Sequence, residues 1–548
     1  MIAVVREAAQ ARRVGSRWPL EVLGVAVLAF LLYGGLRSEL PVDDVLRFTD
    51  NIAAGTYEWD SAHLLMQPAA VLWHRYLGLG APARASQERF NASCAALSVG
   101  LLYLLLLRLE VGLARRLLLT ALGALAFNQV LLATSGHFKL AVLPFLTISL
   151  YQGVLWERGL RQAREEGRSG GDGRLAASAV FLGIAVAFLV NSLLAAPFLG
   201  LAATVVTWRA GGGWRPALRR VLLVGSLAGG VAFAILASGY WLSASGPPDA
   251  AGFSGFLLAK SELYAGNGGL PVTLSRAVFG ILQNFVYLGD FGAMVRTWMI
   301  GDGALLAPER GTLIGLLAVF AAALALLGWA YLGGVLRLLR GDGLVVPWAF
   351  LLGALAFAIP WNLNEADFYF PITFPTVAIL AAAPVSRRRQ LLETALVVLV
   401  ASTVLLGWAL PRRTYPLQRY NAELSSRLTE RDLVVTWSHW AGGPSLLFMD
   451  LPEVWKLYPD KLFYDRDDAE AVFPPLARVL DRRLAGGGRV YLFQVLDGEA
   501  WNAPWPRMRP SGLTPERWER FFRDRYTVVD RGEVAEIPCW ELLPKRRG

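Results

Sequence analysis

Two adjacent carboxylates, Asp43 and Asp44, follow the first long apolar stretch of this 548-residue chain by a few residues. That stretch, residues 20–36, is long enough to cross a bilayer, so the pair is expected where the chain emerges at the membrane surface. A carboxylate that is partly desolvated there has a raised pKa and is a better base. It can take a proton from an acceptor hydroxyl or amine, and its neighbour can raise the pKa further or orient it. The pair is the first candidate for chemistry.

A second group, Ser135 to Lys139 with sequence SGHFK, joins two apolar stretches. Two interpretations of His137 and Lys139 remain open. Both side chains can extend toward lipid headgroups and have no further role. Alternatively they hold the phosphate of a lipid-linked substrate, where a cation would stabilise a leaving group.

A third group, WNLNEADFYFP at residues 361–371, ends one apolar stretch and opens the next. Glu365 and Asp367 near hydrocarbon are costly unless they face a cavity, so this segment is also a functional candidate. The sequence does not show which of the two faces inward. It contains no nucleophile elbow, Walker loop or spaced Cys/His set, and four His argue against a multi-His metal site.

The composition places these groups in a membrane protein. The chain is 55% hydrophobic and 18% charged, with a mean hydropathy of +0.43, which indicates a polytopic membrane protein. We predict eleven apolar membrane helices, at residues 20–36, 90–107, 116–134, 138–156, 175–190, 193–208, 221–242, 312–336, 344–361, 366–384 and 391–410. Most of the net charge of +10 lies in residues 1–410, so no nucleic-acid partner is needed to explain it.

The positive charge is also one-sided. If the joints between helices are counted alternately, one side carries 21 Arg in short joints and the other only 10 Lys and Arg over much more chain. This bias predicts a cytoplasmic amino terminus in an inner or plasma membrane. The long loops at 37–89 and 243–310, and the carboxyl terminus, then face outward.

Two short apolar stretches do not fit the pattern of spans. Residues 63–77 are interrupted by polar side chains, and we expect a helix that lies in the membrane interface. Residues 277–288 are expected to form a re-entrant or interfacial piece.

Residues 411–548 are expected to form a soluble, extracytoplasmic α/β domain after a transmembrane domain at 1–410. Strands are predicted at 432–437, 489–495, 526–530 and near 540–543, with a helix over 514–525 that Thr514 caps. Gly486 to Gly488 precede a strand and are expected to form a turn. Cys94 and Cys539 lie in different parts of the chain and are not expected to pair.

The membrane half resembles the GT-C superfamily of integral-membrane glycosyltransferases, in particular the protein O-mannosyltransferase and lipid A aminoarabinose transferase branch. The resemblance rests on Asp43-Asp44 after the first span, on DSAHLL from Asp60 with His63 and a following Pro68, and on DFYFP at 367–371, which includes Tyr369. The last motif is similar to the family's Arg-Tyr-x-x-Pro, although Asp367 stands in place of its Arg.

This resemblance implies a cell-envelope enzyme that transfers a hexose or pentose, with inversion, from a polyprenyl-phosphate donor to a protein, lipid or glycan acceptor. Asp43 or Asp44 would be the general base, and Asp60, His63, His137, Lys139, Glu365 and Tyr369 would contact substrate. Relatives differ in metal use, and the acidic loop has no ligand spacing that demands a divalent metal.

Two other functions remain as alternatives. A lipid or solute transporter or flippase fits the number of spans, but not the long outer loops or the lack of an internal repeat. A non-enzymatic membrane assembly protein or sensor would use the terminal domain to bind a partner and leave the acidic pair without a task.

Overall fold

The computed structural model describes most of the membrane half and part of the terminal domain. The described residues are 2–38, 45–56, 63–135, 138–168, 170–243, 250–258, 270–288, 310–359, 366–413, 423, 426–429, 431–436, 454–456, 469–493, 495–496, 513–534 and 537–545. The chain divides into two compact units: the first comprises most of the chain up to Arg413, and the second comprises Thr414–Gly548 with the short segments Glu39–Leu46 and Gly301–Leu305. Each unit is described by itself.

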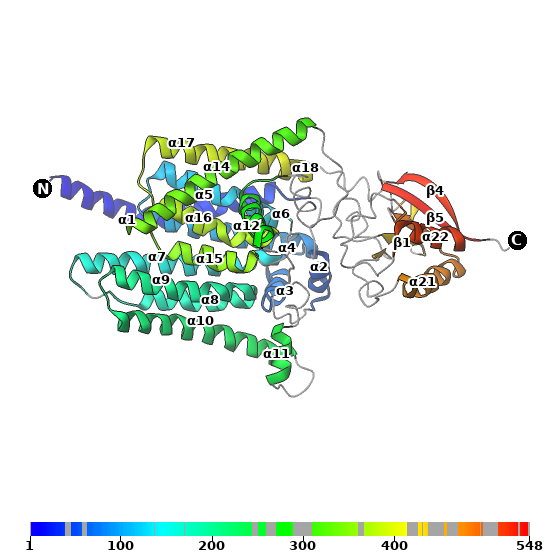
Figure 1. Cartoon of the computed structure of the whole chain (residues 1–548), viewed down its shortest axis with the longest axis horizontal. Helices are drawn as coiled ribbons and strands as arrows, with labels where there is room; N and C mark the ends of the chain where they lie inside the picture. The colour runs from blue at the N-terminus through cyan, green and yellow to red at the C-terminus, as the bar shows by residue number, and fades with distance from the viewer. Residues whose placement is uncertain are drawn as a thin grey trace. The chain divides into compact units, whose positions relative to one another are not determined.

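In its described residues, the first unit consists of helices joined by short turns and loops (Figure 1). Its α-helices are α1 (Ile2–Gly35), α2 (Val45–Ala54), α3 (Met66–Leu77), α4 (Ala83–Arg108), α5 (Leu113–Leu125), α6 (Phe127–Thr134), α7 (Leu143–Glu165), α8 (Gly173–Phe188), α9 (Ala195–Arg209), α10 (Trp214–Ser243), α11 (Ala250–Leu258), α12 (Leu270–Phe285), α14 (Arg310–Arg340), α15 (Val346–Ala358), α16 (Thr373–Ala381), α17 (Arg387–Val404) and α18 (Leu410–Arg413). Three 3₁₀ segments, η1 (Phe138–Val142), η2 (Val190–Leu194) and η3 (Ala366–Ile372), join helices, and a π-helical turn, η4 (Leu405–Ala409), follows α17.

Each of the eleven predicted apolar segments contains helix within its described residues, so the polytopic helical fold is confirmed. Within the described residues, seven helices are long and apolar enough to cross a membrane, or eight if the pair α5 and α6, bent by 58°, is one span. The other three predicted segments contain shorter apolar helices, at Gly173–Phe188, Val346–Ala358 and Phe368–Ala381. In hydrocarbon a helix satisfies its own backbone hydrogen bonds, which is why apolar runs of this length become helices.

The two short apolar stretches are also helical. The stretch at 63–77 contains α3, and the stretch predicted at 277–288 is the carboxyl-terminal part of the longer helix α12. Helix α12 packs on α6, α14 and η3, and its residues Phe279, Leu282 and Phe285 belong to the main apolar core. Helices α2 and α11 were not predicted from the sequence.

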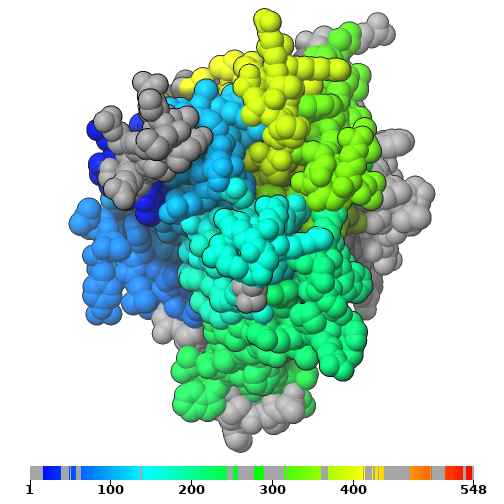
Figure 2. All heavy atoms as spheres, turned by 90° about the vertical axis from the view of Figure 1, so that its left-hand side faces the viewer, coloured from blue at the N-terminus to red at the C-terminus, as the bar shows by residue number. Residues whose placement is uncertain are grey.

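The joints that carry the 21 Arg all lie at one end of the helices, which we call the Arg-rich end. Figure 2 shows this end, where the surfaces of the cyan and green helices meet those of the yellow ones. Several of these Arg side chains are buried and bind the ends of helices.

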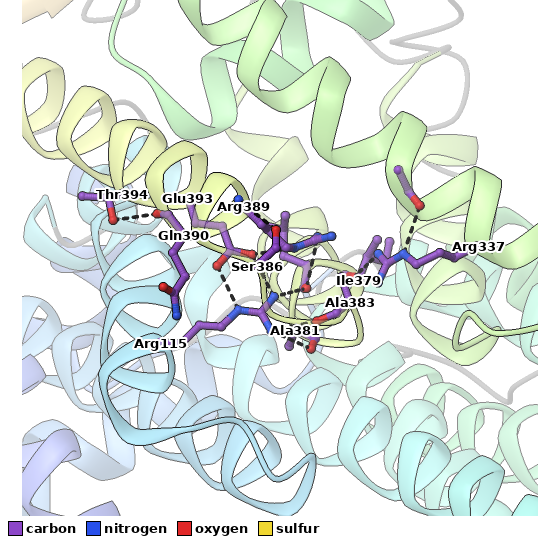
Figure 3. Close-up of polar contacts among 12 residues, drawn as sticks. Arg115, Arg337, Ile379, Ala381, Ala383, Ser386, Arg389, Gln390, Glu393 and Thr394 are labelled. Carbon is purple, nitrogen blue, oxygen red and sulfur yellow. Dashed lines mark hydrogen bonds and ion pairs between the residues drawn. The ribbon is translucent and has the colours of Figure 1, made fainter.

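Arg115 on α5 is the centre of one such cluster (Figure 3). Its guanidinium donates to both carboxylate oxygens of Glu393 on α17, at 2.8 and 2.9 Å. It also donates to the carbonyls of Leu380 and Ala383, at 2.7 and 2.8 Å, where α16 ends. Arg115 and Glu393 are 5% and 0% exposed, so this ion pair lies inside the protein.

Arg389 and Arg337 complete this cluster. Arg389 donates to Glu393 Oε1 at 3.0 Å and to the Leu380 carbonyl, and Arg337 on α14 donates to the Ile379 carbonyl at 3.0 Å (Figure 3). Cations at the carboxyl end of a helix satisfy its free carbonyls and complement its dipole. The end of α16 is thereby fixed to α5, α14 and α17.

A second cluster fixes the start of α15. The buried carboxylate of Glu157 on α7 accepts hydrogen bonds from the backbone amides of Val345 and Val346, at 2.9 to 3.0 Å. Arg161 donates to Glu157 at 2.6 Å and to the Gly343 carbonyl at 2.7 Å. An anion at the amino end of a helix again has the favourable sign.

The described part of the second unit has an α/β fold with one sheet of five strands. The strands are β1 (Leu433–Thr436), β2 (Val454–Lys456), β3 (Val490–Phe493), β4 (Tyr526–Val534) and β5 (Ile537–Pro544), in the order β2-β1-β3-β5-β4. β1 pairs in parallel with β2 and β3, while β5 pairs antiparallel with β3 and β4. Helices α21 (Phe473–Ala485) and α22 (Pro515–Arg525) contribute buried side chains to the core of the sheet, and a short 3₁₀ turn, η7, spans Ala469–Ala471.

This unit matches the sequence prediction in four strands and one helix. Thr514 caps α22 as expected, by accepting from the Arg517 amide at 3.3 Å. β2 and α21 were not predicted. Among the described residues Cys94 and Cys539 are free thiols, as expected.

Asp432 joins the starts of β1 and β3 by accepting from both the backbone and the side chain of Arg489. Burial raises the pKa of Asp432, but the hydrogen bonds from Arg489 and from the Thr429 amide outweigh it and hold this pKa below its ordinary value.

We predict that Glu393→Gln destabilises the protein by about 3–5 kcal/mol, because it leaves the Arg115 charge buried without its counter-ion. Unfolding of the purified protein in detergent measures this loss. Glu110→Gln is the matched control, since Glu110 is 80% exposed in its pair with Arg158 and its loss is expected to cost about 0.5 kcal/mol or less. Equal stability of the two variants would contradict a structural role for the cluster.

Candidate functional site

Three of the predicted site residues, His63, Lys139 and Tyr369, belong to the described residues. The others, Asp43, Asp44, Asp60, His137 and Glu365, lie outside them. The three described residues all lie at the end of the helices opposite the Arg-rich end, at or beside helix junctions. Their surroundings define the candidate site.

Lys139 is buried on η1, with 3% of its surface exposed. Its Nζ atom lies 3.5 Å from the ring centroid of Phe368, a residue of η3 that is 229 positions away. A cation over an aromatic face is held by the ring quadrupole, with about 0.5–2 kcal/mol depending on desolvation. Because the side chain is inside the protein, its ammonium does not extend to an open surface.

The Phe368 ring also lines an apolar pocket beside Lys139. Helix α7, which follows η1, contributes Leu143, Leu146, Thr147 and Leu150, and α15 contributes Phe350 and Phe357. The polar side chains of Asn191 and Ser192 come from η2. Phe368 thus contacts the Lys139 ammonium and also belongs to a pocket whose walls are mainly hydrocarbon and aromatic rings.

His63 lies against the carboxyl end of α8. Its Nδ1 atom is 3.3 Å from the Phe188 carbonyl, and the Leu65 amide donates to the Ala187 carbonyl at 2.8 Å. The Phe188 ring stacks on Phe145 of α7 at 4.9 Å. Leu189, the next residue, lines the apolar pocket. The end of α8 therefore connects His63 with the wall of the pocket.

The helices of the first long loop pack on the segment that carries Lys139. A small apolar cluster joins Ile52 of α2, Met66 and Ala70 of α3, Phe90 of α4 and Ala141 of η1. Amide and hydroxyl groups also link these helices, with Thr49 donating to Gln87 at 3.1 Å and Asn51 donating to Gln67 at 3.3 Å. The structure thus brings the loop helices, His63 and Lys139 into one packed layer.

The segment that contains Asp43 and Asp44 begins at an anchored residue. The Ser38 amide donates to the Thr134 carbonyl at 3.0 Å, at the junction that leads to Lys139. Arg84 donates to the Ser38 carbonyl at 3.3 Å and to Glu88 at 3.0 Å, and Arg37 also pairs with Glu88. This ion group was not predicted from the sequence, although Arg84 and Glu88 have the spacing of a helical pair.

Tyr369 is 5% exposed and packs against a glycine of α12. A Cβ atom on Gly280 would lie only 2.3–2.6 Å from atoms of the Tyr369 ring. Nearby, Asn284 of α12 donates to Thr373 of α16 at 3.0 Å, and both residues are fully buried. Helix α12 therefore positions η3, and with it Phe368 and Tyr369.

Within the described ranges, no group of three or more His, Cys, Asp or Glu side chains could hold a metal ion. The acidic residues Asp43, Asp44 and Asp60 are not among them, so a divalent metal at the first loop stays a sequence-based expectation.

No family model matches the chain, and no curated protein matches it. Solved structures do, and one is the oligosaccharyltransferase AglB from the archaeon Archaeoglobus fulgidus, in complex with an inhibitory peptide and a dolichol-phosphate. It is 12% identical, and the match covers 97% of this chain and 75% of that chain with a TM-score of 0.50.

Two further structures give weaker matches. ArnT from Cupriavidus metallidurans, bound to undecaprenyl phosphate, is 13% identical over 96% of this chain and 98% of that chain, with a TM-score of 0.42. The O-mannosyltransferase complex Pmt1-Pmt2 from S. cerevisiae, bound to the sugar donor, is 18% identical over 41% of this chain and 33% of that chain, with a TM-score of 0.33.

At 12% identity, the archaeal match shows that this chain shares the fold of that oligosaccharyltransferase, which agrees with the fold expected from the sequence resemblance.

We predict that Gly280→Ala destabilises the protein by about 1–3 kcal/mol, because the new methyl group overlaps the Tyr369 ring. Thermal unfolding in detergent provides the measurement. Gly328→Ala on α14 is the matched control, since nothing lies within 4 Å of its Cβ position. If the contact is responsible, the added substitution Tyr369→Ala reduces the cost of Gly280→Ala, and strict additivity would contradict the prediction.

Proposed function

We propose that this integral membrane protein is an inverting glycosyltransferase that moves a sugar from a polyprenyl-phosphate donor to an acceptor at the outer face of the membrane. One observation carries the proposal, namely that the buried ammonium of Lys139 lies on the Phe368 ring, which also lines an apolar pocket. A lipid phosphate needs this combination, a cation for its head and an apolar surface for its chain.

The shared fold supports the same donor class. The archaeal oligosaccharyltransferase that matches at a TM-score of 0.50 was solved with a dolichol-phosphate, which is a polyprenyl-type lipid phosphate. The donor sugar is proposed to be a hexose or pentose, and the acceptor a protein, lipid or glycan.

In the proposed reaction, an acceptor oxygen or nitrogen attacks the anomeric carbon of the donor from the face opposite the phosphate. The bond between the anomeric carbon and the phosphate oxygen breaks, and the lipid phosphate leaves with its electron pair. The proton of the acceptor passes to the carboxylate of Asp43 or Asp44, which is the general base. Lys139 stabilises the negative charge that develops on the leaving phosphate.

The orientation is part of the proposal. The excess of Arg at one end of the helices supports a cytoplasmic location for that end, and then an outer location for the opposite end, with Lys139 and His63. The terminal α/β domain and the first long loop then face the extracytoplasmic side.

We predict that Asp43→Asn and Asp44→Asn, tested separately, give at least one folded protein without transfer activity. An amide of the same size cannot accept the proton, so turnover is expected to fall at least a hundredfold. Transfer from a polyprenyl-phosphate sugar in purified membranes measures it. Asp50→Asn in the same loop is the control and is expected to retain activity.

Full activity in both variants would reject the base assignment. Lipid or solute counterflow that survives both substitutions, in a protein without transferase activity, would instead favour the transporter.

We predict that Lys139→Met reduces turnover by about a hundredfold, because the leaving phosphate loses its cation. Steady-state transfer assays with a polyprenyl-phosphate sugar measure the effect, and Lys139→Arg is expected to recover part of the rate. Arg75→Gln serves as the control, since Arg75 on α3 stacks on Tyr76 and not on the pocket. Unchanged turnover in a folded Lys139→Met protein would show that this cation does not act on the donor.

A further inference from the structure

A groove runs between α8 and α10 at the Arg-rich end, far along the helices from the proposed transferase site. Asp172, Gly173 and Ala176 form one wall, and Arg219, Leu222 and Ser226 are part of the other. The groove has a volume of about 590 Å³ and is open to the surroundings. No step of the proposed reaction uses it.

Two arginines lie at the mouth of the groove, and only Arg219 is exposed to the surroundings. Arg220 is 10% exposed and is occupied by Asp172 at 2.8 Å and by the Thr207 hydroxyl at 3.0 Å. Arg219 is 78% exposed, and its hydrogen bond to Asp172 is long, at 3.5 Å. One carboxylate therefore faces two guanidinium groups, and the exposed one retains most of its donors for another anion.

Below Arg219 the groove is apolar. Leu222, Leu223 and Leu227 line it on α10, and Leu222 is 59% exposed on a helix that qualifies as a membrane span. Ser226 is small and leaves room between the leucines. A hydrocarbon chain fits such a wall, because it is apolar and borders the bilayer.

The long side chain of Arg219 can reach the level of the lipid headgroups. Trp214, at the start of α10, is 64% exposed and carries Arg215 over its ring at 5.5 Å. Exposed Trp side chains mark the level of the headgroups in membrane proteins. At about 1.5 Å per residue, Arg219 lies roughly 7–8 Å further along the helix, and the leucines follow within the next two to three turns.

We propose that this groove binds one anionic glycerophospholipid of the leaflet at the Arg-rich end. Its phosphate pairs with Arg219, and one acyl chain lies along Leu222, Leu223 and Leu227. Arg174 on α8, next to Gly173 of the groove wall, is also exposed. With Arg219 it favours a headgroup with net negative charge over one that carries a choline or ethanolamine cation.

Native mass spectrometry of the full-length protein in detergent tests this proposal. The probes are phosphatidylglycerol and phosphatidylcholine with identical acyl chains, and the readout is the apparent dissociation constant of the tightest lipid. The wild-type protein is expected to bind phosphatidylglycerol about fivefold more tightly than phosphatidylcholine, and Arg219→Gln is expected to remove this preference. Ser226→Trp fills the groove and is expected to weaken both lipids.

Arg215→Gln is the matched control, because Arg215 is an exposed arginine of the same helix whose contact is the Trp214 ring. It is expected to keep the preference, and an unchanged unfolding midpoint shows that each variant is folded. The proposal is overturned if Arg219→Gln keeps the preference or if Arg215→Gln loses it equally. It is also overturned if millimolar glycerol phosphate displaces the lipid completely, since the site would then bind a free anion without its chain.

Discussion

The buried ion pair between Arg115 and Glu393 is the constraint on which the arrangement of the membrane half depends. It fixes the carboxyl end of α16 at the Arg-rich end, through guanidinium bonds to the carbonyls of Leu380 and Ala383. The start of α16 lies at the opposite end, next to η3 and its aromatic residue Phe368. A shift of the anchored end would move that ring away from Lys139. The position of the candidate site is thus set by contacts a full helix length away.

Helix α15 is also anchored by a buried charge, but at its amino end and by an anion. Its amino end is held by the buried carboxylate of Glu157, and its other end carries Phe357 in the wall of the apolar pocket. In both cases the charge has the sign that the helix end favours, anionic at an amino end and cationic at a carboxyl end. Helices α15 and α16 both line the pocket, and each is anchored at the end that lies away from it. The contacts that stabilise these helices and the residues of the candidate site therefore lie at opposite ends of the same helices. The site residues do not have to anchor the helices as well.

The sequence predicted the helices well because length and apolarity alone decide whether a segment becomes a span. The Arg excess in the sequence indicated only the orientation of the chain and not the ion pairs. Their partners Glu157 and Glu393 stand singly in or beside apolar runs, and pairing over such a distance leaves no local sequence pattern. Helix α21 was not predicted, although proline is tolerated in a first helical turn, where Pro474 and Pro475 stand. Lys139 was predicted as a candidate from its position at a junction. Its contact with Phe368 was not predictable, since it depends on how α12 and α16 pack.

The Arg residues at one end of the protein thus divide into two kinds. Arg115 directs its donors to carboxylate and carbonyl oxygens inside the protein, and Arg161 bridges Glu157 and the Gly343 carbonyl, so both are part of the scaffold. Arg219 makes its described hydrogen bond at 3.5 Å and keeps its guanidinium largely exposed above an apolar groove. The difference follows from the number of acceptors that each joint supplies, because a helix end offers several free carbonyls and a single carboxylate already paired with Arg220 does not. The Arg excess at this end is usually explained only by the orientation of the protein in the membrane. In this protein some of these arginines also cap helices, and Arg219 is proposed to select the lipids that surround it.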